Sequence, residues 1–149
     1  MIRLEVIKEK MGKIYTSITI INRADQILAQ RNIINPEEIR SVTLDNVLVD
    51  TGATHLCLTP EIISRLGLEL LKEVEIATAT GVGKARIFRD ATLCLLGRES
   101  TFDCIELPGG QDCLLGVIPL ESLGLEPDLQ NKRLRVLPTE SADTYLTVL

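Results

Sequence analysis

The stretch LVDTGATHLCL, residues 48–58, places one carboxylate inside an otherwise apolar segment. An apolar strand leads into Asp50, and the turn-forming residues Thr51-Gly52-Ala53 follow it. A carboxylate at the end of a buried strand is costly unless it is hydrogen-bonded, paired or protonated. An aspartate that bonds its own turn backbone is the common explanation. A functional explanation requires further residues that would make Asp50 part of an acid pair.

The bulk composition is that of a globular protein with an aliphatic core. The chain has 149 residues, of which 45% are hydrophobic, 25% charged and only 3% aromatic. This length predicts a single domain over residues 1–149. The net charge of -5 argues against nucleic-acid binding, which needs a basic footprint.

Hydropathy gives no indication of membrane insertion or export. No apolar run approaches the roughly 20 residues that span a bilayer. The N-terminal segment MIRLEVIKEKMGK mixes charged and apolar residues and lacks the continuous apolar stretch of a signal peptide. We therefore expect a cytoplasmic protein that does not associate with a membrane.

The cysteines do not form a metal-binding pattern. Cys57, Cys94, Cys104 and Cys113 contain no C-x-x-C pair, and His55 is the only histidine. We therefore expect no metal and no cofactor, and cysteines that act as small buried apolar residues. A cysteine protease is also disfavoured, because its only possible base, His55, lies two residues from Cys57.

Hydrophobic patterning predicts a mostly β chain with two short helices. Thr59, Pro60 and Gly67 suit the cap, the first turn and the stop of a helix over residues 59–68. A second helix is predicted over residues 118–125, and residues 36–38 mark a loop. The predicted strands are 13–22, 25–33, 41–50, 73–79, 84–96, 98–107, 111–117 and 132–138.

Two segments of the chain share one order of features. Residues 47–68 and 112–125 each run from an apolar strand through a glycine turn into a proline-containing helix that ends in Leu-Gly-Leu. This repetition predicts a local two-fold relation between the two segments.

Three motifs in order resemble the retropepsin-like aspartic proteases, the single-lobed family that includes retroviral proteases and bacterial relatives. The motifs are Asp50-Thr51-Gly52-Ala53, the hairpin Thr80-Gly81-Val82-Gly83, and Leu114-Leu115-Gly116. The resemblance covers residues 13–138 and suggests a bacterial-type member. It implies a mostly β fold, a small closed β-barrel of the acid-protease type with one or two short helices and one lobe per chain.

The resemblance also implies a chemistry that explains Asp50. Metal-free peptide hydrolysis needs a base to activate water and an acid to protonate the carbonyl. Two carboxylates about 3 Å apart share one proton and can serve as both, because they cannot both ionise. The expected activity is therefore that of an aspartic endopeptidase acting on peptides or unfolded proteins.

The second carboxylate is expected from another copy of the chain. The sequence has one Asp-Thr-Gly, so a homodimer would bring two copies of Asp50 together across a two-fold axis. By resemblance, Thr51 would hydrogen-bond across the dyad, Gly52 would present its backbone to the carboxylate, and Gly116 would support the turn. Family members often carry an acidic residue after D-T-G-A, where this chain has Thr54.

Several alternative functions remain open at this stage. Residues 80–83 would form the flap over the substrate, or simply an ordinary hairpin; the string GVGK lacks the spacing of a Walker A loop. The terminal segments would join a dimer sheet, or one would be removed by self-cleavage. The main functional alternative is a non-catalytic dimer that binds peptides or acts as a scaffold.

Overall fold

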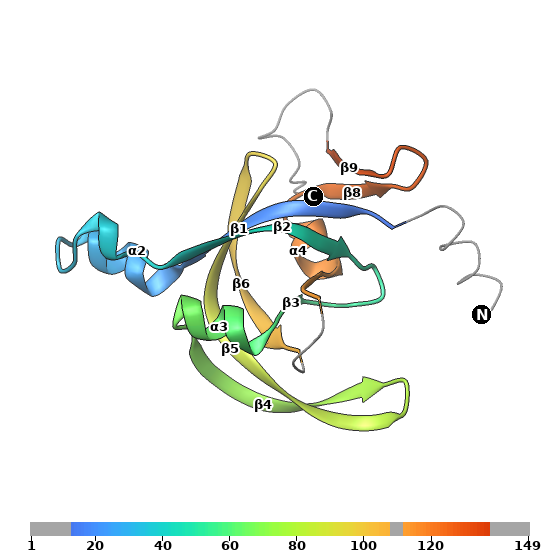
Figure 1. The fold of residues 1–149 in the computed structure, drawn as a ribbon, viewed down its shortest axis with the longest axis horizontal. Helices are drawn as coiled ribbons and strands as arrows, with labels where there is room; N and C mark the ends of the chain where they lie inside the picture. Colours follow the sequence, from blue (N-terminus) through green and yellow to red (C-terminus); the bar gives the residue numbers. More distant parts are fainter. Residues whose placement is uncertain (1–12, 108–111, 138–149) are drawn as a thin grey trace, which may run out of the picture.

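The computed structural model describes residues 13–107 and 112–137, and its strands form a closed barrel (Figure 1). The predictions for both terminal segments lie outside these residues. The strands are β1 (Tyr15–Asn22), β2 (Ser41–Val49), β3 (Leu56–Leu58), β4 (Glu69–Thr78), β5 (Gly81–Leu95), β6 (Arg98–Glu106), β7 (Leu114–Leu115), β8 (Leu125–Asp128) and β9 (Arg133–Val136). The helices are α2 (Arg23–Gln30), α3 (Pro60–Leu66), α4 (Val117–Ser122) and the 3-10 turn η1 (Pro36–Glu38).

The strand order shows how the barrel closes. The main sheet runs β1-β2-β7-β3-β6-β5-β4, and β1 also pairs with β5, so six strands form a ring. Strand β4 lies outside the ring and pairs with β5 as a long hairpin, while β8 and β9 form a separate two-stranded sheet. The prediction of a mostly β, single-lobed barrel is confirmed. The described residues contain three α-helices, where the prediction was one or two.

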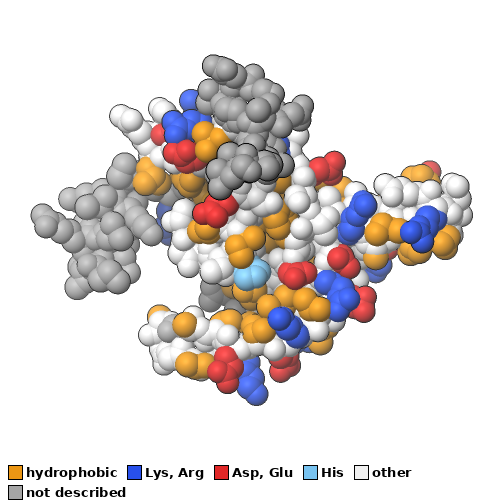
Figure 2. All heavy atoms as spheres, turned by 180° about the vertical axis from the view of Figure 1, so that it is seen from behind, with side chains coloured by type: hydrophobic (Ala, Val, Ile, Leu, Met, Phe, Trp, Pro, Cys, Tyr) orange, Lys and Arg blue, Asp and Glu red, His pale blue; other side chains and the backbone are white. Residues whose placement is uncertain are grey.

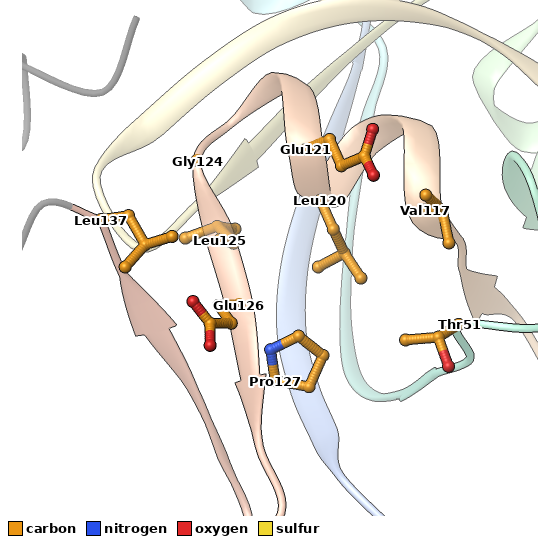
Figure 3. A pocket seen from close by; sticks show the side chains of 9 residues that line it. All are labelled: Thr51, Val117, Leu120, Glu121, Gly124, Leu125, Glu126, Pro127 and Leu137. Carbon is orange, nitrogen blue, oxygen red and sulfur yellow. The ribbon is translucent and has the colours of Figure 1, made fainter.

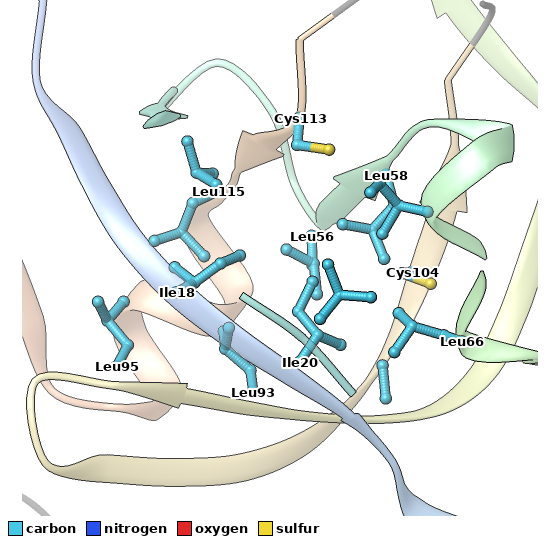
Figure 4. Close-up of a cluster of buried hydrophobic side chains, with 14 of the residues drawn as sticks. Ile18, Ile20, Leu56, Leu58, Leu66, Leu93, Leu95, Cys104, Cys113 and Leu115 are labelled. Atoms are coloured by element: carbon cyan, nitrogen blue, oxygen red, sulfur yellow. The ribbon is translucent and has the colours of Figure 1, made fainter. Parts of the chain in front are cut away.

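The barrel interior is filled by aliphatic side chains (Figure 4). Ile18, Ile20, Leu56, Leu93 and Leu115 come from four different strands and are almost fully buried. They belong to strands β1, β3, β5 and β7, which lie around the ring. Burial of each such side chain stabilises the fold by about 1.5–3 kcal/mol, so this core holds the ring together.

The predicted strand over residues 25–33 is wrong, because this segment begins with helix α2. The side chain of Asn22 accepts a hydrogen bond from the Asp25 backbone N–H at 3.0 Å and caps the helix. A cap at the end of β1 stops the extended chain and starts a helical turn. The signal was present in the sequence as an asparagine three residues before an aspartate.

Other boundaries differ from the predictions in smaller ways. Strands β3 and β8 lie in segments where no strand was predicted. The turn of the β4–β5 hairpin lies at Ala79 and Thr80, since Thr78 pairs with Gly81. Residues 82 and 83 therefore belong to β5 and not to the turn as predicted.

The predicted two-fold relation between the repeated segments has a structural counterpart. Strands β3 and β7 pair antiparallel, with Leu56 opposite Leu115 and Cys57 opposite Leu114. Two antiparallel strands are related by a local two-fold axis. Each strand is followed within two residues by a short helix, α3 after β3 and α4 after β7.

An ion pair fixes the position of the helix α2. The Asp25 carboxylate, almost fully buried, accepts hydrogen bonds from Arg40 Nε at 2.8 Å, Nη2 at 3.0 Å and the backbone N–H at 3.0 Å. Hydrogen bonding by the Arg40 side chain lowers the pKa of Asp25 below its usual range. The ionised pair thus holds the start of α2 against the chain that enters β2.

We expect Asp25→Asn to lower the free energy of unfolding at pH 7 by about 1–2 kcal/mol, because charge-assisted hydrogen bonds are lost. A folded-state pKa below the unfolded value stabilises the fold above about pH 4, and this contribution disappears as the pH falls through the folded value. The difference in urea unfolding between the two proteins should therefore be largest at pH 7 and shrink as the pH falls below about 4. If the exposed control Glu37→Gln lowered the free energy of unfolding as much as Asp25→Asn does, this explanation would be contradicted.

Candidate active site

Asp50 lies directly after β2, at the start of a tight turn. Its backbone N–H donates to the Leu115 carbonyl at 3.0 Å, and its carbonyl accepts from the Ala53 N–H at 3.1 Å. The carboxylate oxygen Oδ1 accepts a hydrogen bond from the Gly52 N–H at 2.8 Å. The side chain is half-buried. In the described part of the chain, no hydrogen bond joins Asp50 to a second carboxylate.

Two glycines lie where a side chain would crowd this turn. A Cβ at Gly52 would lie 3.1 Å from Asp50 Oδ1, close enough to disturb the hydrogen bond from the Gly52 backbone. A Cβ at Gly116 would lie 2.5 Å from the His55 carbonyl oxygen and 2.7 Å from that of Ala53. Both oxygens belong to backbone, which cannot yield as a flexible side chain can. Only glycine therefore allows β7 and the turn to approach this closely.

Three backbone hydrogen bonds join the turn to the start of α4. The N–H groups of Gly116, Val117 and Ile118 donate to the carbonyls of residues His55, Ala53 and Thr54, at 3.1, 2.9 and 2.9 Å. These bonds satisfy the donors at the start of the helix, which have no partner within it. The turn that carries Asp50 is thus held in place by the first residues of α4.

The other end of α4 is held by a buried arginine that the sequence patterns did not single out. Arg98 Nη1 donates to the carbonyls of Leu123 at 2.7 Å and Gly124 at 2.9 Å. A cation at the carbonyl end of a helix also interacts favourably with the helix dipole. Because Arg98 begins β6, this contact fixes α4 to the barrel wall.

Thr51 lies exposed on the turn and lines a pocket of about 410 Å³ (Figure 3). The figure shows the pocket between α4, which contributes Val117 and Leu120, and β8, which contributes Leu125. Most of the lining is apolar. The complete lining set is Thr51, Val117, Leu120, Glu121, Gly124, Leu125, Glu126, Pro127 and Leu137.

The histidine and the cysteine beside the turn do not form a nucleophilic pair. His55 Nδ1 lies 2.6 Å from Thr54 Oγ1, and the Cys57 thiol donates to the His55 backbone carbonyl at 3.4 Å. Burial, with the charge of Asp50 as a smaller cause, raises the pKa of Cys57 to about 11. A thiol with such a pKa stays protonated at neutral pH, which disfavours it as a nucleophile.

The remaining predicted site residues lie on the β4–β5 hairpin. Thr80 is in its turn, while Gly81, Val82 and Gly83 begin β5, and the Val82 side chain is 76% exposed. In the view of Figure 1 the hairpin tip and the turn between β2 and β3 project toward the same side of the barrel. The structure thus brings the D-T-G-A turn and Gly116 into contact, and it places residues 80–83 on a separate hairpin.

Within residues 13–107 and 112–137, no three His, Cys, Asp or Glu side chains are grouped so that they could hold a metal ion. No helix among the described residues is long and apolar enough to cross a bilayer. The face in Figure 2 carries acidic and basic side chains interspersed with apolar ones.

A closed barrel with a glycine-supported D-T-G-A turn defines the single-lobed, retroviral type of aspartic protease fold. The chain belongs to the family described as gag-polyprotein putative aspartyl protease, whose model matches residues 29–122. That match includes Asp50, the β4–β5 hairpin and Gly116. Membership of the retropepsin-like family is therefore confirmed, while the bacterial type stays a prediction.

Solved structures give a further comparison. The chain is similar to the EIAV protease complexed with the inhibitor HBY-793, with 20% sequence identity and a TM-score of 0.47. The similarity covers 74% of this chain and 88% of that protease. Among curated proteins, no sequence matches this chain.

We expect Gly116→Ala to lower the free energy of unfolding by about 1–3 kcal/mol, because the added Cβ must push the Ala53 and His55 carbonyls away. Thermal or urea unfolding measures this loss. Ser122→Ala, an exposed change at the other end of α4, is the control and should be near neutral. A Gly116→Ala protein as stable as the control would contradict the close contact between β7 and the turn.

Proposed function

We propose that this chain is an aspartic endopeptidase that hydrolyses peptide bonds with a water activated by two copies of Asp50, one from each subunit of a homodimer. The observation that carries the proposal is the half-buried Asp50 carboxylate on a turn that Gly52 and Gly116 hold in one geometry. Such rigid placement is what acid–base catalysis needs, because the reacting groups must be within hydrogen-bond reach of the substrate.

The need for a second copy follows from the position of the other aspartates. Asp45, Asp90, Asp103 and Asp112 lack the following Thr-Gly, and none of them hydrogen-bonds to Asp50. A lone carboxylate would supply the base but not the acid. A two-fold axis beside the turn would bring two equivalent carboxylates together, and the two would then share one proton.

The surface beside Thr51 supports this axis. The apolar pocket between α4 and β8 opens next to Thr51, and β8 forms a sheet with β9 alone among the described strands. A two-stranded sheet is marginally stable unless further strands or a hydrophobic face cover it. Leu125 and Leu134 already pack one face of this sheet against the core, and a second copy that packs against the pocket and the other face of the sheet would align the two turns.

The reaction follows from the protonation of the pair. In the resting state the two carboxylates share one proton, because like charges this close cannot both ionise. The ionised carboxylate takes a proton from water, whose oxygen attacks the peptide carbonyl, while the protonated carboxyl donates to the carbonyl oxygen. The tetrahedral intermediate breaks when the carboxyl that took the water proton passes it to the nitrogen and the other carboxylate takes a proton from one hydroxyl. The C–N bond then breaks, the amine leaves and the pair again shares one proton.

The β4–β5 hairpin is suited to cover an extended peptide. Val74, Ile76 and Ala85 share one face of this ribbon, and Glu73 and Arg86 share the other, because side chains alternate along a strand. The apolar face would contact apolar side chains beside the bond to be cut. The exposed Val82 lies opposite Ala77 on the same face as Glu73 and Arg86, and it would find cover against the partner subunit.

We expect Asp50→Asn to reduce cleavage of a mixed peptide library by at least about a hundredfold, since the amide can neither accept nor supply the shared proton. Mass spectrometry of the released peptides measures this loss. Sedimentation should show the same dimer for both proteins, because the change removes no apolar contact.

Asp45→Asn is the matched control, because Asp45 is exposed on β2 and five residues from the site. It should cleave as the wild type does, with a bell-shaped dependence on pH. If wild type and Asp50→Asn were equally inactive from pH 3 to 8, the chain would instead be a peptide-binding or scaffold dimer of this fold.

A further inference from the structure

Strand β5 changes its neighbours along its length. Its later residues pair with β6, starting where Ile87 faces Ile105, whereas residues 81–86 pair in the described structure with β4 alone. The hairpin therefore leaves the barrel at residue 87 as a two-stranded ribbon. A ribbon attached at one end bends most easily at its junction, because the remaining strands of the barrel are held on both sides.

An ion pair lies at this junction. Arg86 Nε donates to Glu106 Oε1 at 2.9 Å, and Arg86 Nη2 donates to Glu106 Oε2 at 2.8 Å. This is the bidentate geometry of the strongest arginine–carboxylate pairs. The Glu106 side chain is only 15% exposed, while that of Arg86 is 48% exposed. The Arg86 guanidinium also lies 5.3 Å above the ring of the buried Phe88.

The glutamate connects this junction to the candidate active site. Glu106 ends β6 and pairs with Leu58 of β3, and the next residue, Leu107, donates its N–H to the Leu58 carbonyl at 2.7 Å. Strand β3 begins shortly after the turn that carries Asp50. The ion pair therefore ties the base of the ribbon to the same strand that leaves the catalytic turn.

We infer that Arg86 and Glu106 are positioning residues that hold the β4–β5 ribbon closed over Asp50. The inference rests on the proposed function, in which this ribbon covers the bound peptide. The apparent affinity for a ligand falls in proportion to the fraction of molecules in the competent conformation. Loss of the pair should thus raise KM, while kcat is preserved because saturating peptide closes the ribbon.

The variants Glu106→Gln and Arg86→Gln test this role. Each should raise KM for a reporter peptide about three- to tenfold and change kcat less than about twofold. Arg86→Lys keeps the positive charge but loses the bidentate contact, so its KM should lie between those of the wild type and Arg86→Gln. The reversed pair Arg86→Glu with Glu106→Arg should return KM to within about threefold of the wild type, a rescue that a purely local packing role would not give.

Hydrogen exchange provides a readout that does not depend on activity. Amides of residues 73–86 should exchange about three- to tenfold faster in the single variants, and those of β1 should exchange as in the wild type. Lys84→Gln is the matched control: it removes a positive charge two residues closer to the tip, from a side chain without an ion pair in the described structure. It should leave both KM and exchange unchanged.

Unchanged exchange of residues 73–86 in Glu106→Gln would overturn the inference, whether or not the protein cleaves peptides. A failure of the reversed pair to restore KM would overturn it as well. Faster exchange in a protein that cleaves no peptide would support the role of the Arg86–Glu106 contact and would contradict the proposed function instead. If a glutamine variant does not fold, Arg86→Lys and the reversed pair supply the same comparison.

Discussion

The whole site depends on the close approach of two backbone segments, the turn at residues 53–55 and the start of α4 at residues 116–118. Three N–H···O bonds join them, and the contact is possible only because Gly116 has no side chain. Asp50 itself is tied to β7 by the bond from its N–H to the Leu115 carbonyl. The position of the carboxylate is therefore set by backbone, which varies less than side-chain rotamers and suits a group that, in the proposed dimer, must meet its symmetry mate.

Around this fixed point the molecule divides into parts that differ in how their strands are paired. The six-stranded ring, filled by aliphatic side chains and joined to α4 through Arg98, forms a rigid support. Residues 81–86 of β5 pair with β4 alone, and the Arg86–Glu106 ion pair joins the base of this ribbon to β6. An enzyme that must admit a long peptide and then exclude water needs this combination, a rigid catalytic turn and a cover that can move.

Much of this arrangement could be predicted from sequence, because local patterns carry it. The alternation of apolar and polar residues predicted most strands. Thr59 and Gly67 predicted the two ends of α3, and in the structure Thr59 caps this helix and Gly67 ends it in the left-handed conformation. The segment after Asn22 was mistaken for a strand, since its apolar residues outweighed a capping signal that only one side chain carries. Arg98 and the Arg86–Glu106 pair could not be predicted, because their partners lie 20 or more residues away and meet only in the folded chain.

The central claim is that each active site needs one Asp50 from each of two chains, and mixing experiments test it most directly. A fixed amount of wild-type protein is mixed with increasing amounts of Asp50→Asn protein, exchanged to equilibrium and assayed for peptide cleavage. With random pairing, a tenfold excess of the variant should lower the activity to about a tenth, because most wild-type chains then sit in mixed dimers that lack one carboxylate. Activity that stays constant throughout the titration would show that one chain suffices, and would contradict the account.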